Sequence, residues 1–332
     1  MDGTEALSAR LRGLDGVRLW ANAPLAPFTT IGTGGKAALL VTVRAAEALA
    51  AVLAALGEAG VDWFCLGAGS NLLVADRGYK GVVIKLDESF HYVEGLPAAP
   101  VEPTPDCRPV ALTVGAAAYL ARLAAVVAEA GLSGMEHACG IPGSVGGAVA
   151  MNAGAYGWCM RDVVREVQIV TAAGVHWVAA QDLEWGYRYC LLPKDSVVTA
   201  ARLELMPAEC AAVMECQRGY LRQRREKQPR SVRTFGSSFK NPPGQHAGRL
   251  VDAAGLKGLR RGGAEISSVH GNFLVILGDA TTADVLALMT LMRQGVERMS
   301  GVTLEPEVRL LGASFPWDSH EHPAPERPPG DG

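Results

Sequence analysis

The sequence lacks the features that mark secreted, membrane-spanning and metal-binding proteins. Its first residues, MDGTEALSAR, carry an early acidic residue and no apolar segment, so no signal peptide is expected. No uninterrupted apolar run approaches the roughly 20 residues of a transmembrane helix, so we predict no membrane insertion. The seven cysteines include no C-x-x-C pair, and the seven histidines form no ligand cluster. These absences predict reduced thiols, no metal site and a cytoplasmic protein.

A strong net charge is also absent. The formal net charge is -3 and the isoelectric point about 6.2, so no nucleic-acid partner is predicted. The chain has 332 residues, of which 49% are hydrophobic and 20% are charged. This is the composition of a globular protein and the length of two or three packed subdomains.

Hydrophobic patterning alternates between predicted strands and predicted helices. The predicted strands are 38–43, 63–66, 81–86, 111–115, a hairpin over 163–180 turned at Ala173-Gly174, 196–206, 273–277 and 304–312. The predicted helices are 44–58, ended near Gly60, then 116–130, 208–228, 247–255 and 282–299, the last capped by Thr281 or Thr282. Residues 140–157, GIPGSVGGAVAMNAGAYG, have six glycines, one proline and no charge, so they are predicted as a loop. The order of elements predicts an α/β (α+β) fold.

Composition divides the chain into five predicted parts. They are an N-terminal extension over 1–21, two subdomains over 22–88 and 89–206, a C-terminal α/β domain over 207–312, and a tail over 313–332. The tail is rich in Pro, Asp, Glu and His, so it is predicted to be disordered.

Three glycine clusters are the first candidate site: GTGGKA at 32–37, LGAGSNLL at 66–73 and the stretch 140–157. Glycine permits positive φ and lets backbone N–H groups face an anion. Each cluster alone could be a tight turn, but three beside predicted strands, with polar residues among them, favour a large phosphate-bearing ligand. None contains G-x-x-x-x-G-K-[ST], and GAGSNL lacks the third glycine of the dinucleotide fingerprint.

Three further motifs carry polar residues suited to catalysis. WGYRYCLLP at 185–193 places Tyr187 beside Arg188, although such a pair is often only a surface pair. RTFGSSFKNP at 233–242 could present Ser237 on a turn, or be a serine-rich turn; with no histidine in the motif, a serine hydrolase is not predicted. In LEPEVR, period-two alternation puts Glu305, Glu307 and Arg309 on one face, which could also be a solvated strand face.

The order of these motifs resembles one family. T-x-x-x-G-G, L-G-x-G-S-N-L-L, the long glycine-rich stretch, Y-R, G-S-x-F-K-N-P and a near-terminal L-E-P-E-V-R are similar to UDP-N-acetylenolpyruvoylglucosamine reductase, the MurB family. The resemblance runs from about residue 22 to 312, and 247–258 and 267–276 also resemble the family's C-terminal part. It implies the FAD-binding fold of the vanillyl-alcohol oxidase/PCMH type in the two subdomains, followed by a substrate domain.

The resemblance implies one non-covalent FAD, because no histidine stands where covalent linkage is familiar. GAGSN at 67–71 would hold the pyrophosphate, and 140–147 with 152–154 would line the flavin. A loop without charge can approach a flavin closely without fixing a charge at the redox centre. The implied cofactor residues are Thr30, Gly34, Gly35, Gly67, Ala68, Gly69, Ser70, Asn71, Leu72, Gly115, Gly140, Ile141, Pro142, Gly143, Ser144, Gly146, Gly147, Asn152, Ala153 and Gly154.

The resemblance also implies a reaction, the reduction of UDP-N-acetylglucosamine enolpyruvate to UDP-N-acetylmuramate in peptidoglycan precursor synthesis. NADPH would give hydride to FAD, which would pass it to the vinyl carbon of the substrate. Arg188 and its partner Glu307 would support the enolate, and Ser237 would protonate the adjacent carbon. The nucleotide sugar would be held by Tyr187, Arg224, Lys240 and Asn241.

Some features depart from the family or leave alternatives open. The stretch between Arg188 and Ser237 has no room for an inserted tyrosine loop, which favours the shorter form of the family. Trp158, Cys159 and Met160 replace the usual small residue and glutamate after GAYG. The alternatives are another flavoprotein of the same fold and a non-catalytic nucleotide-sugar-binding module. A monomer is expected.

Overall fold

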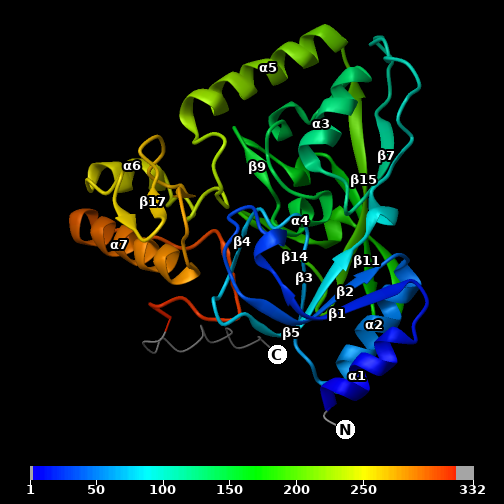
Figure 1. The fold of residues 1–332 in the computed structure, drawn as a ribbon. Helices are drawn as coiled ribbons and strands as arrows, with labels where there is room; N and C mark the ends of the chain where they lie inside the picture. Colours follow the sequence, from blue (N-terminus) through cyan, green and yellow to red (C-terminus); the bar gives the residue numbers. More distant parts are fainter. Residues whose placement is uncertain (1–2, 319–332) are drawn as a thin grey trace, which may run out of the picture.

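The structure is a computed structural model that describes residues 3–318 (Figure 1). Its first sheet has the strand order β1-β2-β5-β3. The strand bounds are Val17–Pro24 for β1, Lys36–Val43 for β2, Tyr79–Leu86 for β5 and Trp63–Cys65 for β3. The predicted strands at 38–43, 63–66 and 81–86 are therefore confirmed. β2 and β5 are apolar runs because both faces of this sheet are buried.

The helix α2, Ala46–Ala59, packs its predicted apolar face into the core, with Leu49, Val52, Leu53 and Leu56 all buried. Gly60 ends it in the left-handed conformation, where glycine has no Cβ to clash. The prediction of a separate N-terminal extension over 1–21 is wrong. Helix α1, Gly3–Arg12, buries Leu7 and Leu11 in the same core, and β1 pairs with β2 from Val17 onward.

The second sheet has the order β12-β11-β15-β7-β6, with β8 paired to β15. Its strands are β6 Val93–Glu94, β7 Val110–Gly115, β8 Leu132–Ser133, β11 Val164–Thr171, β12 Gly174–Ala179 and β15 Val197–Pro207. The hairpin predicted at 163–180 is present, but Thr171 pairs with Gly174. Its turn is therefore at Ala172-Ala173, one residue before the predicted position.

The glycine-rich stretch is not entirely a loop, contrary to the prediction. Helix α4, Val145–Ala150, forms within it and packs on β15. Ser144 starts this helix by accepting a hydrogen bond from the Gly147 N–H, and Val145, Ala148 and Val149 are buried. Capping and burial outweigh the low helix propensity of its two glycines. The predicted helix at 116–130 forms as α3, Leu120–Glu129.

A second hydrophobic core lies in the C-terminal part. Buried side chains of α6 Ala247–Ala253, β17 Ala264–Ile266, β18 Leu274–Ile276 and α7 Thr282–Ser300 contribute to it, and the exposed strand β16 Arg260–Arg261 pairs with β17. Thr281 caps α7 in a capping box with Asp284. The strand predicted at 304–312 is shorter, because only β19, Arg309–Leu311, forms a ladder; it pairs with β4, Leu72–Val74, of the first subdomain.

Two predicted boundaries are wrong. Helix α5, Cys210–Lys227, contacts α3 and β8, so it belongs to the second subdomain and the C-terminal domain begins after it rather than at 207 (Figure 1). Phe315 and Trp317 stack on each other and pack on the C-terminal core, so residues 313–318 are ordered. Residues 319–332 of the predicted tail lie outside the described residues. No helix between residues 3 and 318 is long and apolar enough to cross a bilayer.

Candidate active site

Two of the glycine clusters lie in direct contact. Ser70 Oγ donates a hydrogen bond to the Pro142 carbonyl over 2.9 Å. A Cβ atom on Gly67 would lie 2.5 Å from Ser144 Oγ, so a larger residue there would displace the hydroxyl that caps α4. Residues 66–73, which follow a strand of the first subdomain, therefore form one continuous backbone surface with 140–147 of the second.

Residue 69 has to be glycine, because the chain on the other side of the loop leaves no room for a side chain. Its φ is +65°, and a Cβ atom would meet the Phe28 carbonyl oxygen at 1.9 Å. The left-handed conformation turns the chain sharply at this point, and the missing side chain lets residues 28–30 approach. Thr30 N–H donates to the Gly69 carbonyl over 3.1 Å, which fixes the third wall of the site.

A cavity of about 210 Å³ lies where these segments meet. Six of its lining residues are predicted cofactor residues, and two were missed because they belong to no motif. The six are Thr30, Ala68, Ser70, Ile141, Pro142 and Gly143, and the two are Tyr119 and Ala121. The glycine cradle, the apolar lining and the absence of fixed charge fit an FAD in contact with the backbone.

Several predicted cofactor glycines are also required by backbone packing. A Cβ atom on Gly35 would strike the Asp76 carbonyl, one on Gly115 the Phe90 carbonyl and one on Gly154 the Trp158 carbonyl. A Cβ atom on Gly34 would likewise strike Val74, and one on Gly146 would strike Ala116. Leu72 is buried in β4 and Gly147 caps onto Ser144. Backbone packing therefore explains these residues without a ligand, and none of them lines the cavity described above.

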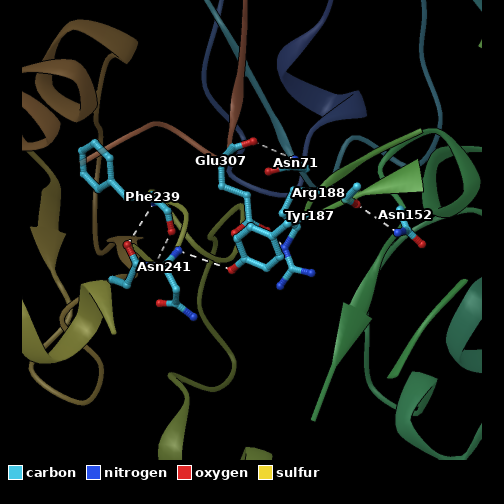
Figure 2. Close-up of polar contacts among 9 residues, drawn as sticks. Asn71, Asn152, Tyr187, Arg188, Phe239, Asn241 and Glu307 are labelled. Carbon is cyan, nitrogen blue, oxygen red and sulfur yellow. Dashed lines mark hydrogen bonds and ion pairs between the residues drawn. The ribbon is translucent and has the colours of Figure 1, made fainter. Parts of the chain in front are cut away.

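The second group of site residues is built on a two-residue hairpin turn. Strands β13, Glu184–Gly186, and β14, Tyr189–Leu191, pair so that Tyr187 and Arg188 form the turn. Arg188 has φ +66°, a strained conformation for a residue with a side chain. Asn152, at φ +40°, holds the hairpin by donating from Nδ2 to the Gly186 carbonyl over 3.0 Å (Figure 2). The strain is therefore concentrated where the glycine-rich stretch meets Arg188.

Arg188 forms an ion pair with Glu307, as predicted. The distance from Arg188 Nε to Glu307 Oε1 is 2.8 Å, and the two side chains are 20% and 15% exposed. Burial raises the pKa of Glu307, and the charges of Arg188 and Lys240 oppose that shift. Asn71 Nδ2 donates to the Glu307 backbone carbonyl over 3.1 Å, so the glycine cluster at 66–73 is linked to the segment that carries Glu307 (Figure 2).

The G-S-x-F-K-N-P segment lies beside this pair. The Glu307 N–H donates to the Ser238 carbonyl over 2.9 Å, and Ser237 forms an antiparallel bridge with Phe273. Ser238 is fully buried, whereas Ser237 is half-buried. Ser238 and the following Phe239 are both enclosed, so of the two serines only Ser237 keeps a partly accessible side chain.

Asn272 is a site residue that motif reasoning missed. Its Oδ1 accepts from the Phe239 N–H over 3.0 Å and its Nδ2 donates to the Phe239 carbonyl over 2.8 Å. These two bonds fix the backbone between Ser237 and Lys240. Its position in ISSVHGNFLVI, far from the serine motif in sequence, gave no signal.

Three of the four predicted substrate residues come together. The Asn241 N–H donates to Tyr187 Oη over 3.3 Å (Figure 2). Lys240 pairs with Glu305 at 3.3 Å. Arg224, on α5, lies instead against the glycine-rich stretch: its Nη1 donates to the Gly140 carbonyl over 3.3 Å and its guanidinium lies over the Tyr156 ring. Burial lowers the Arg224 pKa, and within residues 3–318 its Nε has no hydrogen-bond partner.

Trp158 stands where the resembling family usually has a small residue, and the packing around it accounts for its size. The Trp158 ring is buried and stacks on His137, with centroids 6.4 Å apart and planes at 6°. Met160 is also buried, while Cys159 and Asp162 close a single turn. No group of three or more histidine, cysteine or acidic side chains suited to a metal ion occurs in the described part of the chain.

Comparison with known proteins gives a consistent result. Residues 37–179 match the sequence profile of an FAD binding domain, and 228–311 match that of the C-terminal domain of UDP-N-acetylenolpyruvoylglucosamine reductase. The second profile begins where the packing places the C-terminal domain.

Individual relatives cover nearly the whole chain. The reductase of Anaeromyxobacter dehalogenans strain 2CP-C is 46% identical over 90% of this chain and 86% of its own length. That of Myxococcus xanthus is 43% identical over 92% and 96%. The crystal structure of the Thermus caldophilus enzyme superposes with a TM-score of 0.74 at 37% identity, covering 89% of this chain and 98% of its own. The predicted FAD-binding fold is confirmed, and the chain belongs to the UDP-N-acetylenolpyruvoylglucosamine reductase family.

Proposed function

We propose that this protein is an FAD-dependent reductase that uses NADPH to reduce UDP-N-acetylglucosamine enolpyruvate to UDP-N-acetylmuramate for peptidoglycan synthesis. Family membership supports the reaction. The Arg188–Glu307 ion pair supports the proposed residue roles. The Glu307 backbone bonds to Asn71 in the glycine cradle and to Ser238 in the serine segment. The glycine cradle, the Arg188 cation and the serine segment are thus all bonded to Glu307.

The cofactor would be held by backbone rather than by charged side chains. Residues 67–71 and 140–147 supply N–H groups and close approach, and the cavity wall of Thr30, Ile141 and Pro142 supplies apolar contact. Bound FAD supplies hydride transfer between NADPH and the substrate. The chain itself excludes water, orients the substrate and moves the proton.

Arg188 supports the negative charge that develops on the substrate carboxylate. Hydride addition to the vinyl carbon sends electron density into the carboxylate as an enolate, and a planar guanidinium can donate two parallel hydrogen bonds to it. Glu307 holds Arg188 Nε and leaves the remaining N–H groups for the substrate. The hairpin turn and the Asn152 bond keep this fork in place before the substrate arrives.

Ser237 donates the proton that completes the reduction. Its O–H bond breaks as a C–H bond forms at the carbon next to the one that received hydride, and the serine oxygen recovers a proton from water. Ser237 is half-buried, so solvent can reach it after the product leaves. Ser238 is excluded from this role because its hydroxyl is enclosed in the core.

The nucleotide sugar would be bound by cations and hydrogen-bond donors around the pair. Tyr187, Lys240 and Asn241 lie on two segments that meet across the Tyr187–Asn241 bond. Arg224, which is half-buried over the glycine-rich stretch, would meet an anionic group of the ligand. The seven unpaired cysteines support a cytoplasmic location, and the protein would act as a monomer.

An anaerobic titration tests the function against its alternatives. Purified protein should be yellow, lose that colour when NADPH is added and regain it when the enolpyruvyl substrate follows. Colour that is restored by oxygen but not by the substrate would favour another flavoprotein of this fold. A colourless protein that takes up no added FAD would favour a nucleotide-sugar-binding module.

A further inference from the structure

A tyrosine at the wall of the cofactor cavity has no role in the proposed reaction and belongs to none of the motifs. Tyr119 is 56% exposed, although a large aromatic ring gains from burial. It lines the cavity together with Ala121, Ile141 and Pro142, which are apolar. An exposed aromatic ring beside an apolar cavity is an arrangement that a flat ligand would complete.

The helix that follows does not explain this tyrosine. Tyr119 is the N-cap residue of α3, and its side chain makes no capping hydrogen bond. Ser, Thr, Asp and Asn are preferred at this position because their short side chains accept from the helix N–H groups, which a tyrosine ring does not. The ring is therefore accounted for by the cavity rather than by the start of the helix.

The backbone around Tyr119 is held in place, and its ring has one aromatic neighbour. Its backbone forms an antiparallel bridge with Ser144, and the Leu120 N–H donates to the Gly143 carbonyl over 3.0 Å. The ring meets His91 edge to face, with centroids 5.4 Å apart and planes at 81°. A ring that is fixed before the ligand arrives loses little conformational entropy on binding.

The position of the cavity indicates which end of FAD meets this ring, and this step rests on the proposed FAD site. The flavin ring must lie near Arg188, Ser237 and Glu307, because hydride passes to the substrate there. None of these three lines the cavity. Ala68 and Ser70 of the proposed diphosphate loop do line it, so the cavity adjoins the diphosphate without reaching Arg188, and the adenine ring is the aromatic group expected there. Residues 141–143, which the resemblance assigns to the flavin, would then lie at the adenine end.

We propose that Tyr119 stacks on the adenine ring of FAD and so makes the site select FAD over FMN. Its phenol face would cover one side of the adenine, and Ile141 and Pro142 would line the cavity around it.

Titration of the apoprotein with FAD and with FMN, followed by flavin fluorescence, tests this proposal. In Tyr119→Ala, the Kd for FAD should rise about 10- to 100-fold, the scale of losing one base–aromatic stack. The Kd for FMN should stay at the parent value, and ADP should lose its ability to compete with FAD. Tyr119→Phe and Tyr119→Trp should keep the parent affinity for FAD.

Trp20→Ala is the matched control, because Trp20 is also exposed but lies on β1 and does not line the cavity. It should leave all these constants unchanged. Parent-like FAD affinity in Tyr119→Ala would overturn the proposal, and so would equal losses for FMN and FAD, which would place the flavin ring there. Equal losses in the Ala, Phe and Trp variants would also contradict stacking. A parent apoprotein that binds no FAD would overturn the cofactor site itself.

Discussion

At the scale of single residues, the site depends on how two neighbouring serines and two charged side chains are oriented. The resemblance predicted Glu307 as the partner of Arg188, and the two side chains form an ion pair; the role of Ser237 stays a prediction. Tyr119 and Asn272 could not be predicted, since their contacts join segments far apart in sequence. The choice between Ser237 and Ser238 is made by burial, which only the fold shows.

Arg188→Lys should damage the second half-reaction. A lysine ammonium is a point charge that cannot keep the Glu307 bond and present a planar pair of donors together. Reoxidation by the enolpyruvyl substrate should slow by about 10²-fold or more, the scale of a lost transition-state donor. Reduction by NADPH should continue. Arg309→Lys, an exposed residue near the same segment, is the control; parent-rate reoxidation in Arg188→Lys would refute the assigned role.

Glu307 should make stability depend on pH in a defined direction. Burial raises its pKa above the ordinary value of 4.5, so the folded protein holds this proton more tightly than the unfolded chain. Its contribution is then fully present below pH 4.5 and is lost as pH rises through the raised pKa. Glu307→Gln cannot bind this proton. The unfolding free energy of the variant minus that of the parent should therefore rise as pH increases from 4.5 through the raised pKa of Glu307.

Denaturant unfolding at several pH values measures this difference. Glu305→Gln removes a carboxylate from the same segment at an exposed position, which controls for the change in net charge. A difference between Glu307→Gln and the parent that falls as pH rises would mean that the Arg188 charge, not burial, dominates.

At the scale of elements, the strands and helices with strong apolar periodicity were predicted closely, and the glycine-rich stretch was not. α2 and α7 have apolar faces and end at glycines, so residues within or next to each helix determine where it ends. α4 depends on the burial of Val145, Ala148 and Val149 against β15, which the local sequence does not encode. The hairpin turn at residues 172–173 moved by one residue because strand register is set by both partner strands.

The link between the glycine-rich stretch and the hairpin should be sensitive to Asn152. Asn152→Asp keeps an acceptor for the Arg161 N–H but faces the Gly186 carbonyl with a second acceptor. The variant should lose about 1–3 kcal/mol of unfolding free energy, the cost of a buried carbonyl left without its donor. Asn22→Asp is the matched control, because Asn22 also has a positive φ but is exposed. Equal effects of the two substitutions would show that the Asn152 bonds contribute nothing.

At the scale of the whole molecule, the FAD-binding fold and its C-terminal domain were predicted, but three boundaries were misplaced. Each error concerns packing between distant segments: α1 with α2, α5 with α3, and Phe315 and Trp317 with the second core. Composition marks where a chain becomes polar or apolar, and it does not say which core receives a helix. The two cores are tied by β4 and β19 and by the Asn71–Glu307 bond, so the cofactor and serine segments are positioned together.

FAD should bind without a covalent bond and stabilise the whole protein. Acid precipitation should release all the yellow colour, and colour kept in the pellet would contradict this. The reconstituted protein should unfold at higher denaturant concentration than the apoprotein. With free FAD at about 100 times its Kd, the gain is expected to be about 2.7 kcal/mol, because ligand binds only the folded state.

The central claim is that Ser237 donates the proton beside the Arg188–Glu307 pair, and the two half-reactions measured separately by stopped flow test it most directly. Ser237→Ala should bind FAD and be reduced by NADPH at the parent rate. Its reoxidation by the enolpyruvyl substrate should slow by about 10²–10⁴-fold, the scale of a lost general acid. Ser238→Ala, which changes only a buried hydroxyl without a partner in the described chain, should reoxidise normally. Normal reoxidation in Ser237→Ala would contradict the account, and slow reoxidation in Ser238→Ala alone would assign the proton to the other serine.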